Sequence, residues 1–199
     1  RGSWTSSNGP LQGHDGWLGS RRRSGDFMVE QAVHVWDVLN WIQGGPPVSA
    51  VGWGRRGLFA ATQPGRDVTD HYAVELLWAD GFRASFHQSY IAPADDGFTG
   101  SSLRVLGVDG GFDFNSGSLT LRDRERTRRT VEPGVRNDTR LALEAFLAAV
   151  RSDSPVAPPV TLQEARDATL TGLLVRQAVD AGGEATMADV LAAASSHSA

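Results

Sequence analysis

The sequence predicts an α+β fold in which one largely antiparallel sheet carries its helices on a single face. Short segments of alternating apolar and polar residues, typical of strands, are grouped between residues 48 and 131. Apolar residues at helical spacings of three and four precede this block at 28–42 and return after residue 138. Strands and helices in separate blocks favour a layered α+β arrangement over the strand–helix alternation of a parallel sheet.

The composition is that of one ordinary globular domain. The chain has 199 residues, of which 40% are hydrophobic and 21% are charged, and no apolar run approaches the ~20 residues that a membrane span needs. It has no cysteine, and all 19 basic residues are arginines, which excludes disulfides, thiolate chemistry and a lysine nucleophile within these residues. A net charge of −4 with only local arginine clusters argues against nucleic-acid binding.

Residues 1–27 are predicted to be an irregular loop segment. Glycine and serine are frequent there, and Trp4 and Trp17 are its main apolar anchors. The chain begins at Arg1 rather than at methionine. We interpret the segment as a remnant of a preceding domain, so that residues 28–199 form the α+β domain proper.

The helix expected at 28–42 ends at a Gly-Gly-Pro-Pro sequence, and an extended segment over 48–59 follows. The alternation from Asp70 to Tyr90 predicts a hairpin that turns at residues 79–81. A three-residue loop is preferred, because it alone places the large apolar side chains of both strands on one face. The opposite face is then semi-polar and carries His71, Glu75, Arg83 and His87.

Further elements follow the hairpin. Alternating runs predict strands at 103–108, 111–114, 119–122 and 128–131, and helices are predicted at 141–151, at 162–181 and near the C-terminus. The first of these helices is expected to be capped by Asp138 or Thr139. The other two carry capping boxes, Thr161 with Glu164 and Thr186 with Asp189.

Residues 52–57 read Gly-Trp-Gly-Arg-Arg-Gly and match the G-x-G-x-x-G dinucleotide pattern. That pattern requires a helix to start at once, so that its N-terminus meets the pyrophosphate. Pro64 and Gly65 leave no room for such a helix. We therefore interpret these glycines as positions where a strand passes closely under its neighbours.

Glu30, His34 and Asp37 lie at helical spacings that place them on one stripe of the first predicted helix. A carboxylate one turn from an imidazole can orient the ring, and histidine exchanges protons near neutral pH. Two other interpretations remain: a solvated helix face, or a metal site, for which the sequence shows no further ligand. Arg55 is a candidate for binding an anionic substrate, and His71 with His87 could line a site on the sheet.

The stretch from Gly25 to Arg56 resembles the C-terminal domain of the Gfo/Idh/MocA oxidoreductases, which include glucose-fructose oxidoreductase and inositol dehydrogenase. In that family a helix with the motif acid-x-x-x-His-x-x-Asp opens the domain, and a Trp-x-x-Gly-x-Pro segment leads into the sheet. The matching positions here are Glu30, His34, Asp37, Trp41, Gly44 and Pro46. Two departures are that Glu30 replaces the usual aspartate, and that the family's N-terminal nucleotide-binding domain with its Glu-Lys-Pro motif is absent.

The resemblance implies an open sheet whose helix-covered side faces the cofactor domain and whose other side forms a homo-oligomer. It implies a sugar, polyol or cyclitol substrate, and NAD or NADP bound mainly by an N-terminal Rossmann domain, with no metal. His34 would be the proton-transfer residue, Glu30 its orienting partner or a substrate ligand, and Asp37 a supporting residue. The alternatives are a non-catalytic binding or dimerisation module of the same fold, and a metal-dependent sugar-processing protein.

Overall fold

The computed structural model describes residues 1–6, 16–93, 97–131, 137–154 and 156–196. Within them the helices are α1 (Arg21–Ser24), α2 (Phe27–Glu30), α3 (Val33–Gln43), α4 (Asp138–Arg151), α5 (Leu162–Ala181) and α6 (Met187–Ser196). The strands are β1 (Gly2–Thr5), β2 (Ser49–Arg56), β3 (Thr69–Leu77), β4 (Arg83–Ser89), β5 (Gly100–Leu106), β6 (Gly110–Asp113), β7 (Ser118–Leu121), β8 (Arg128–Thr130) and β9 (Glu184–Thr186).

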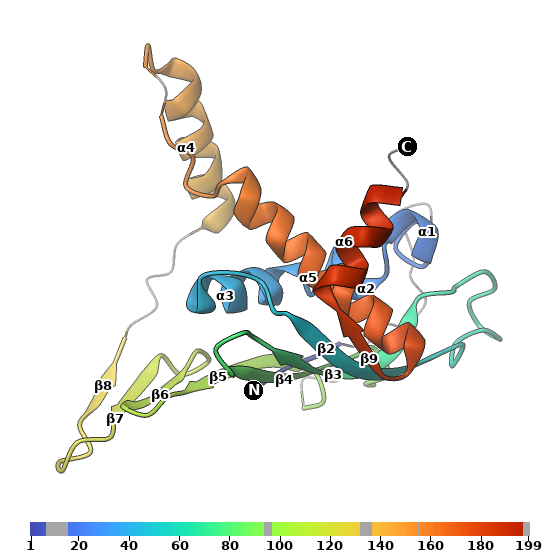
Figure 1. Cartoon of the computed structure of the whole chain (residues 1–199), viewed down its shortest axis with the longest axis horizontal. Coiled ribbons are helices and arrows are strands. Elements are labelled where there is room, and N and C mark those ends of the chain that lie inside the picture. The colour runs from blue at the N-terminus through green and yellow to red at the C-terminus, as the bar shows by residue number, and fades with distance from the viewer. Residues whose placement is uncertain (7–15, 94–96, 132–136, 155, 197–199) are drawn as a thin grey trace.

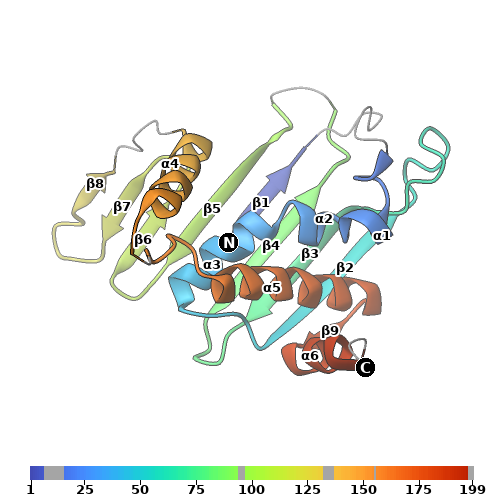
Figure 2. The ribbon, with the colours of Figure 1, turned by 90° about the horizontal axis from the view of Figure 1, so that it is seen from above.

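These strands form one open sheet in the order β8-β7-β6-β5-β1-β4-β3-β2-β9. Every adjacent pair is antiparallel except β1 with β4. The helices lie on one side of the sheet (Figures 1 and 2), which we call the helix side, and the other side is the open face. The predicted α+β class and the largely antiparallel sheet are confirmed.

The strand at Gly2–Thr5 corrects the prediction of an irregular loop over residues 1–27. β1 lies in the middle of the sheet and pairs with both β4 and β5, so its backbone groups are satisfied on both edges. Trp4 packs against the hydrophobic core. Four residues are too few to show an alternating pattern, and the two strands that pair with β1 begin only at Arg83 and Gly100. Local sequence therefore could not predict this strand.

The hairpin of β3 and β4 has the predicted register. Leu76 pairs with Ala84 and Val74 with Phe86, and Gly81 takes a left-handed conformation with φ 88°. The apolar face of this hairpin is buried against α3 and α5, where Trp36, Leu174 and Val175 are fully buried. Alternation on two strands was sufficient to fix the register because a one-residue slip would expose this whole set.

Gly52 and Gly54 lie in β2 where α5 crosses it. A Cβ atom on Gly54 would stand 2.7 Å from Cγ1 of Val179, and one on Gly52 would stand 3.0 Å from its Cγ2. The G-x-G-x-x-G sequence is therefore a site of close strand–helix packing and forms no phosphate-binding turn.

The remaining predicted elements differ from the observed ones mainly at their ends. β5 to β8 and α4 to α6 all occur, and the capping box of Thr161 and Glu164 is present at α5. Asn137 caps α4 through a bond from the amide of Arg140, so the prediction of Asp138 or Thr139 was wrong by one or two positions. Among the described residues, no helix combines the length and the apolar character needed to cross a membrane.

Candidate active site on the helix side

The helix that carries the acid–His–Asp motif is interrupted between Glu30 and Val33. In a continuous helix the carbonyl of Met28 would accept from the amide of Ala32. That carbonyl instead accepts from the indole N–H of the buried Trp36 at 2.7 Å, and the Ala32 amide bonds to the carbonyl of Phe27. The wider turn separates α2 from α3 and changes the direction in which residues on its two sides point.

The prediction of one helix over 28–42 with Glu30, His34 and Asp37 on a single stripe is therefore wrong. Glu30 ends α2, whereas His34 and Asp37 belong to α3. His34 and Asp37 line two different pockets, and Glu30 lines neither of them. The motif residues are close in sequence, but the structure does not gather them around one cavity.

His34 is exposed near the start of α3 and lines a pocket of about 270 Å³. The other walls come from β1, from β5 and from the residues after β6, and they include Ser3, Trp4, Ser101, Ser102, Phe114 and Asn115. Asn115 is held in place, since its Nδ2 donates to the carbonyl of Ser101 at 2.5 Å and its Oδ1 accepts from the amide of Leu103 at 3.1 Å. The pocket thus combines an imidazole with hydroxyl and amide groups and two aromatic rings.

Glu30 lies close to a buried chain of polar side chains behind α2. Tyr72 donates to Gln88 Oε1 at 2.7 Å, Gln88 Nε2 donates to the Tyr90 hydroxyl at 2.6 Å, and that hydroxyl donates to Gln31. Burial raises the pKa of Tyr90 strongly, and the negative charge of nearby Glu30 raises it further. Both effects keep this phenol protonated, so it serves as a hydrogen-bond donor.

Asp37 lines a larger pocket, of about 610 Å³, between the end of α3 and the start of α5. Trp41 stands at its edge with 76% of its surface exposed. The other polar lining includes Asn40, Gln163 and Asp167. Asp37 is thus placed one turn beyond His34 along α3 but faces a separate space.

Arg55 and the two histidines of the sheet lie on the open face. Arg55 pairs in register with His71, and His87 pairs with Ala73. His87 lines a pocket of about 350 Å³ together with Glu75, Ser85 and Trp53. The sheet separates all of these residues from His34, so the structure does not bring Arg55 into the pocket on the helix side.

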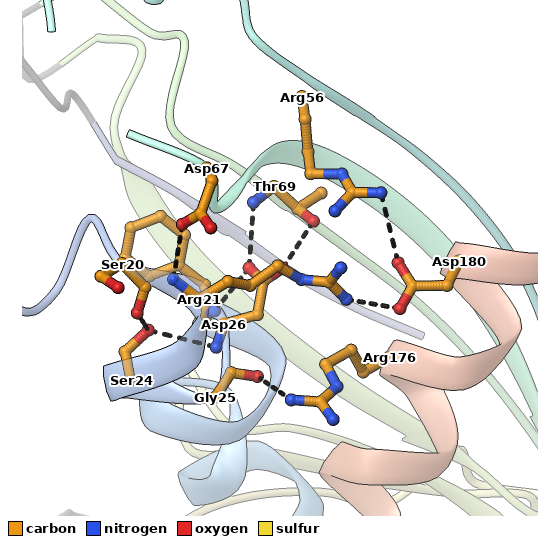
Figure 3. Close-up of polar contacts among 11 residues, drawn as sticks. Ser20, Arg21, Ser24, Gly25, Asp26, Arg56, Asp67, Thr69, Arg176 and Asp180 are labelled. Carbon is orange, nitrogen blue, oxygen red and sulfur yellow. Dashed lines mark hydrogen bonds and ion pairs between the residues drawn. The ribbon is translucent and has the colours of Figure 1, made fainter. Parts of the chain in front are cut away.

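Sequence reasoning missed a buried ionic network that holds the start of α2 in place (Figure 3). Asp26 is fully buried and accepts hydrogen bonds from Phe27 N, from Thr69 N and Oγ1, and from Arg21 Nε at 2.8 Å. Arg21 also bonds Asp180 of α5 at 2.5 Å. An aspartate directly before a helix is a common N-cap signal, and it could have identified Asp26.

No group of three or more His, Asp or Glu side chains that could hold a metal ion occurs in the described part of the chain. Nor do Gly52 and Gly54 offer a dinucleotide cradle, because Val179 fills the space above them. The described residues therefore supply an exposed imidazole in a small polar pocket, and the glycines of β2 form no dinucleotide cradle.

Solved structures with the same fold include two dehydrogenases. UDP-N-acetylglucosamine 3-dehydrogenase from Acidithiobacillus ferrooxidans matches with a TM-score of 0.64 and 20% identity, over 91% of this chain and 53% of that one. Levoglucosan dehydrogenase in complex with NADH and levoglucosan matches with a TM-score of 0.70 and 16% identity, over 94% of this chain and 58% of that one. This chain therefore spans little more than half the length of either structure.

A comparison with curated protein sequences gives no significant match. The family model of the GFO/IDH/MocA C-terminal domain matches residues 1–113, which include β1, the interrupted helix with His34, and the strands up to β6. The chain belongs to the GFO/IDH/MocA family and represents its C-terminal domain.

Proposed function

We propose that this chain is the substrate-side domain of an NAD(P)-dependent oxidoreductase that acts on a hydroxyl group of a sugar, polyol or cyclitol. The observation that carries the proposal is the position of His34, exposed in a pocket whose lining includes Ser101, Asn115 and the aromatic residues Trp4 and Phe114. At about 270 Å³, the pocket is close to the lower end of small-molecule sites, ~300 Å³. The dehydrogenases of the same fold support the reaction class.

In the proposed reaction His34 exchanges the proton of the substrate hydroxyl. Neutral imidazole accepts this proton when the alcohol is oxidised and returns it when the carbonyl is reduced. Ser101 and Asn115 would hold neighbouring hydroxyls, while Trp4 and Phe114 would contact the apolar face of the ring. Glu30 lies on the other side of the interrupted turn, so we assign it an influence on the position of α3 and no direct contact with substrate.

The nicotinamide, when bound, exchanges a hydride with the carbinol carbon. We assign its binding to an N-terminal Rossmann domain of the full-length gene product. Reading the gene upstream of Arg1 tests this directly. A glycine-rich strand–turn–helix there supports the proposal, and an unrelated or missing domain contradicts it.

The chain alone is expected to bind NADH with no more than millimolar affinity, because its only G-x-G-x-x-G sequence lies in β2 beneath Val179. Calorimetric titration of the 199-residue chain with NADH measures this. The full-length gene product is the positive control. Micromolar binding by the 199-residue chain would contradict our assignment of the dinucleotide to another domain.

The open face is expected to form a homodimer interface. Ala73, Glu75, Arg83 and His87 are exposed there on the central strands, and a mixed polar and apolar surface of this kind is typical of protein interfaces. Ala73→Arg should weaken self-association by at least about tenfold, since it places a long charged side chain at the centre of the patch. Ala61→Arg in the exposed loop after β2 is the control. Sedimentation equilibrium of wild type and both variants gives the result, and a monomeric wild type at high concentration would contradict the prediction.

A further inference from the structure

A groove of about 550 Å³ lies on β5 to β8, at the outer end of the sheet (Figure 2). Arg104 of this groove follows Leu103, which packs on the core from the helix side, so the Arg104 side chain points to the open face. Asp113 pairs in register with Arg104 and with Ser118, which extends the same face across β6 and β7. The sheet therefore separates this groove, which we call the arginine groove, from the His34 pocket.

The floor of the arginine groove is low because β6 has a glycine at its centre. Gly111 pairs in register with Leu106 on one side and with Thr120 on the other, and Thr120 pairs with Arg128. A Cβ atom on Gly111 would stand 2.8 Å from Cδ2 of Leu106, so a larger residue would crowd Leu106 and narrow the groove. The volume of about 550 Å³ lies within the range of small-molecule sites, ~300–1,000 Å³.

Four arginines line the groove: Arg104, Arg122, Arg126 and Arg128. Arg104 Nε donates to Asp113 Oδ2 at 2.7 Å and Arg128 Nη2 donates to Ser118 Oγ at 3.2 Å, so both guanidinium groups lie over the strands of the groove. Arg122, Arg126 and Arg128 form no ion pair with any residue that the structure describes. Three guanidinium groups are therefore available to an anion from solution.

The turn between β7 and β8 holds Arg126 in an unusual conformation. Asp123 Oδ1 accepts from the amide of Thr127 at 2.7 Å, and the carbonyl of Asp123 accepts from the amide of Arg126 at 3.2 Å. Arg126 has a φ of 52°, in the left-handed region that is uncommon for residues other than glycine. An arginine thus occupies a position of this turn at which a glycine would be less strained.

The groove is positively charged although the chain as a whole is negative. Besides the four arginines, its lining includes two carboxylates, Asp113 and Asp123. The hydrogen bond from Arg104 lowers the pKa of Asp113, and hydrogen bonds from Thr127 lower the pKa of Asp123, so both are ionised at neutral pH. Four positive and two negative charges leave the groove with +2, whereas the whole chain carries −4. A phosphate group carries about −1.5 to −2 at pH 7 and matches this charge.

We propose that the arginine groove binds a phosphate group, either as free phosphate or as a phosphate ester. Guanidinium groups form bidentate, charge-assisted hydrogen bonds with phosphate oxygens, and the hydroxyls of Ser118 and Thr120 lie on the same face to donate further bonds. The groove contains none of the residues of the predicted dimer interface. Because the sheet separates it from His34, the bound phosphate is a ligand additional to the alcohol substrate, and this proposal does not depend on the proposed reaction.

Amide chemical shifts of the ¹⁵N-labelled 199-residue chain test the proposal during titration with inorganic phosphate and with glycerol 3-phosphate at constant ionic strength. Amides within residues 104–128 should shift saturably with half-saturation at about 1 mM or below, as a few charge-assisted hydrogen bonds imply. Tighter binding of glycerol 3-phosphate would identify the ligand as a phosphate ester, and equal or tighter binding of inorganic phosphate would identify it as free phosphate. Shifts that do not saturate, or that sodium acetate produces equally, would overturn the proposal.

Arg128→Gln should raise the dissociation constant for inorganic phosphate at least about tenfold, because it removes a guanidinium group from the groove. Arg126→Gln should weaken binding as well, and it leaves the pairing of β8 untouched. Arg129→Gln is the matched control: it removes the same charge, but Arg129 pairs in register with Leu119 on the helix side, so the constant should change less than about twofold. Circular dichroism verifies that all three variants are folded. Equal losses for Arg128→Gln and Arg129→Gln would show a general charge effect and overturn the proposal.

Discussion

His34→Ala in the full-length enzyme is expected to reduce turnover by roughly two to four orders of magnitude, the usual contribution of a general acid–base group. The melting temperature should change by less than about 2 °C, because the side chain is exposed and contributes little to packing. Steady-state kinetics and thermal unfolding on the same preparations give both numbers. A variant that lost stability while each folded molecule kept its turnover would show that His34 has a structural role.

Glu30→Gln in the full-length enzyme is the variant to compare with His34→Ala. The interrupted turn between α2 and α3 separates Glu30 from the pocket of His34, so this variant should lose clearly less turnover than His34→Ala. A Glu30→Gln enzyme as inactive as His34→Ala would indicate that both side chains contact the reacting group, contrary to the arrangement described above.

Asp26→Ala is expected to lower the free energy of unfolding by about 3–5 kcal/mol, the typical result of removing one partner from a buried ion pair. The substitution leaves Arg21 without its buried carboxylate and removes the acceptor for the amide and hydroxyl of Thr69. Alanine would also have to keep the positive φ of 79° seen at Asp26, which aspartate tolerates better than alanine. Denaturant unfolding of the 199-residue chain measures the loss.

Glu144→Ala is the control for Asp26→Ala. Glu144 pairs with Arg140 on the surface of α4 at 2.7 Å, a distance close to the 2.8 Å of the Arg21–Asp26 pair. Unlike Asp26, both Glu144 and Arg140 are exposed. Exposed i, i+4 pairs of this kind contribute only about 0.3–0.5 kcal/mol. Similar losses for the two variants would mean that burial of the Asp26 network has no special effect on stability.

Local patterns predicted the parts of the fold in which a few neighbouring residues decide the outcome. The β3–β4 register follows from the alternation around Gly81, and the start of α5 follows from the Thr161 capping box. β1 could not be predicted, because its four residues become a strand only between β4 and β5. β9 has only three residues and also depends on its pairing with β2.

The sequence pointed to His34 as a candidate residue, but it did not predict the geometry around it. Sequence spacing identified His34, and the structure places it in a pocket with β1 and β5. The spacing could not show that the indole N–H of Trp36 donates to the carbonyl of Met28, where the helix is interrupted. Nor could it place Arg55 and His34 on opposite sides of the sheet, because that depends on which face of β2 is covered by α5.

We propose that His34 exchanges the proton of a sugar, polyol or cyclitol hydroxyl in a nicotinamide-dependent oxidoreductase. The most direct test of this proposal is the absorbance at 340 nm of the full-length gene product incubated with NAD or NADP and a panel of sugars, polyols and cyclitols. We expect substrate-dependent reduction of the dinucleotide with at least one member of the panel, and its loss or near-loss in His34→Ala. A folded protein that binds the dinucleotide but gives no change in absorbance with any member of the panel, in either reaction direction, would contradict it.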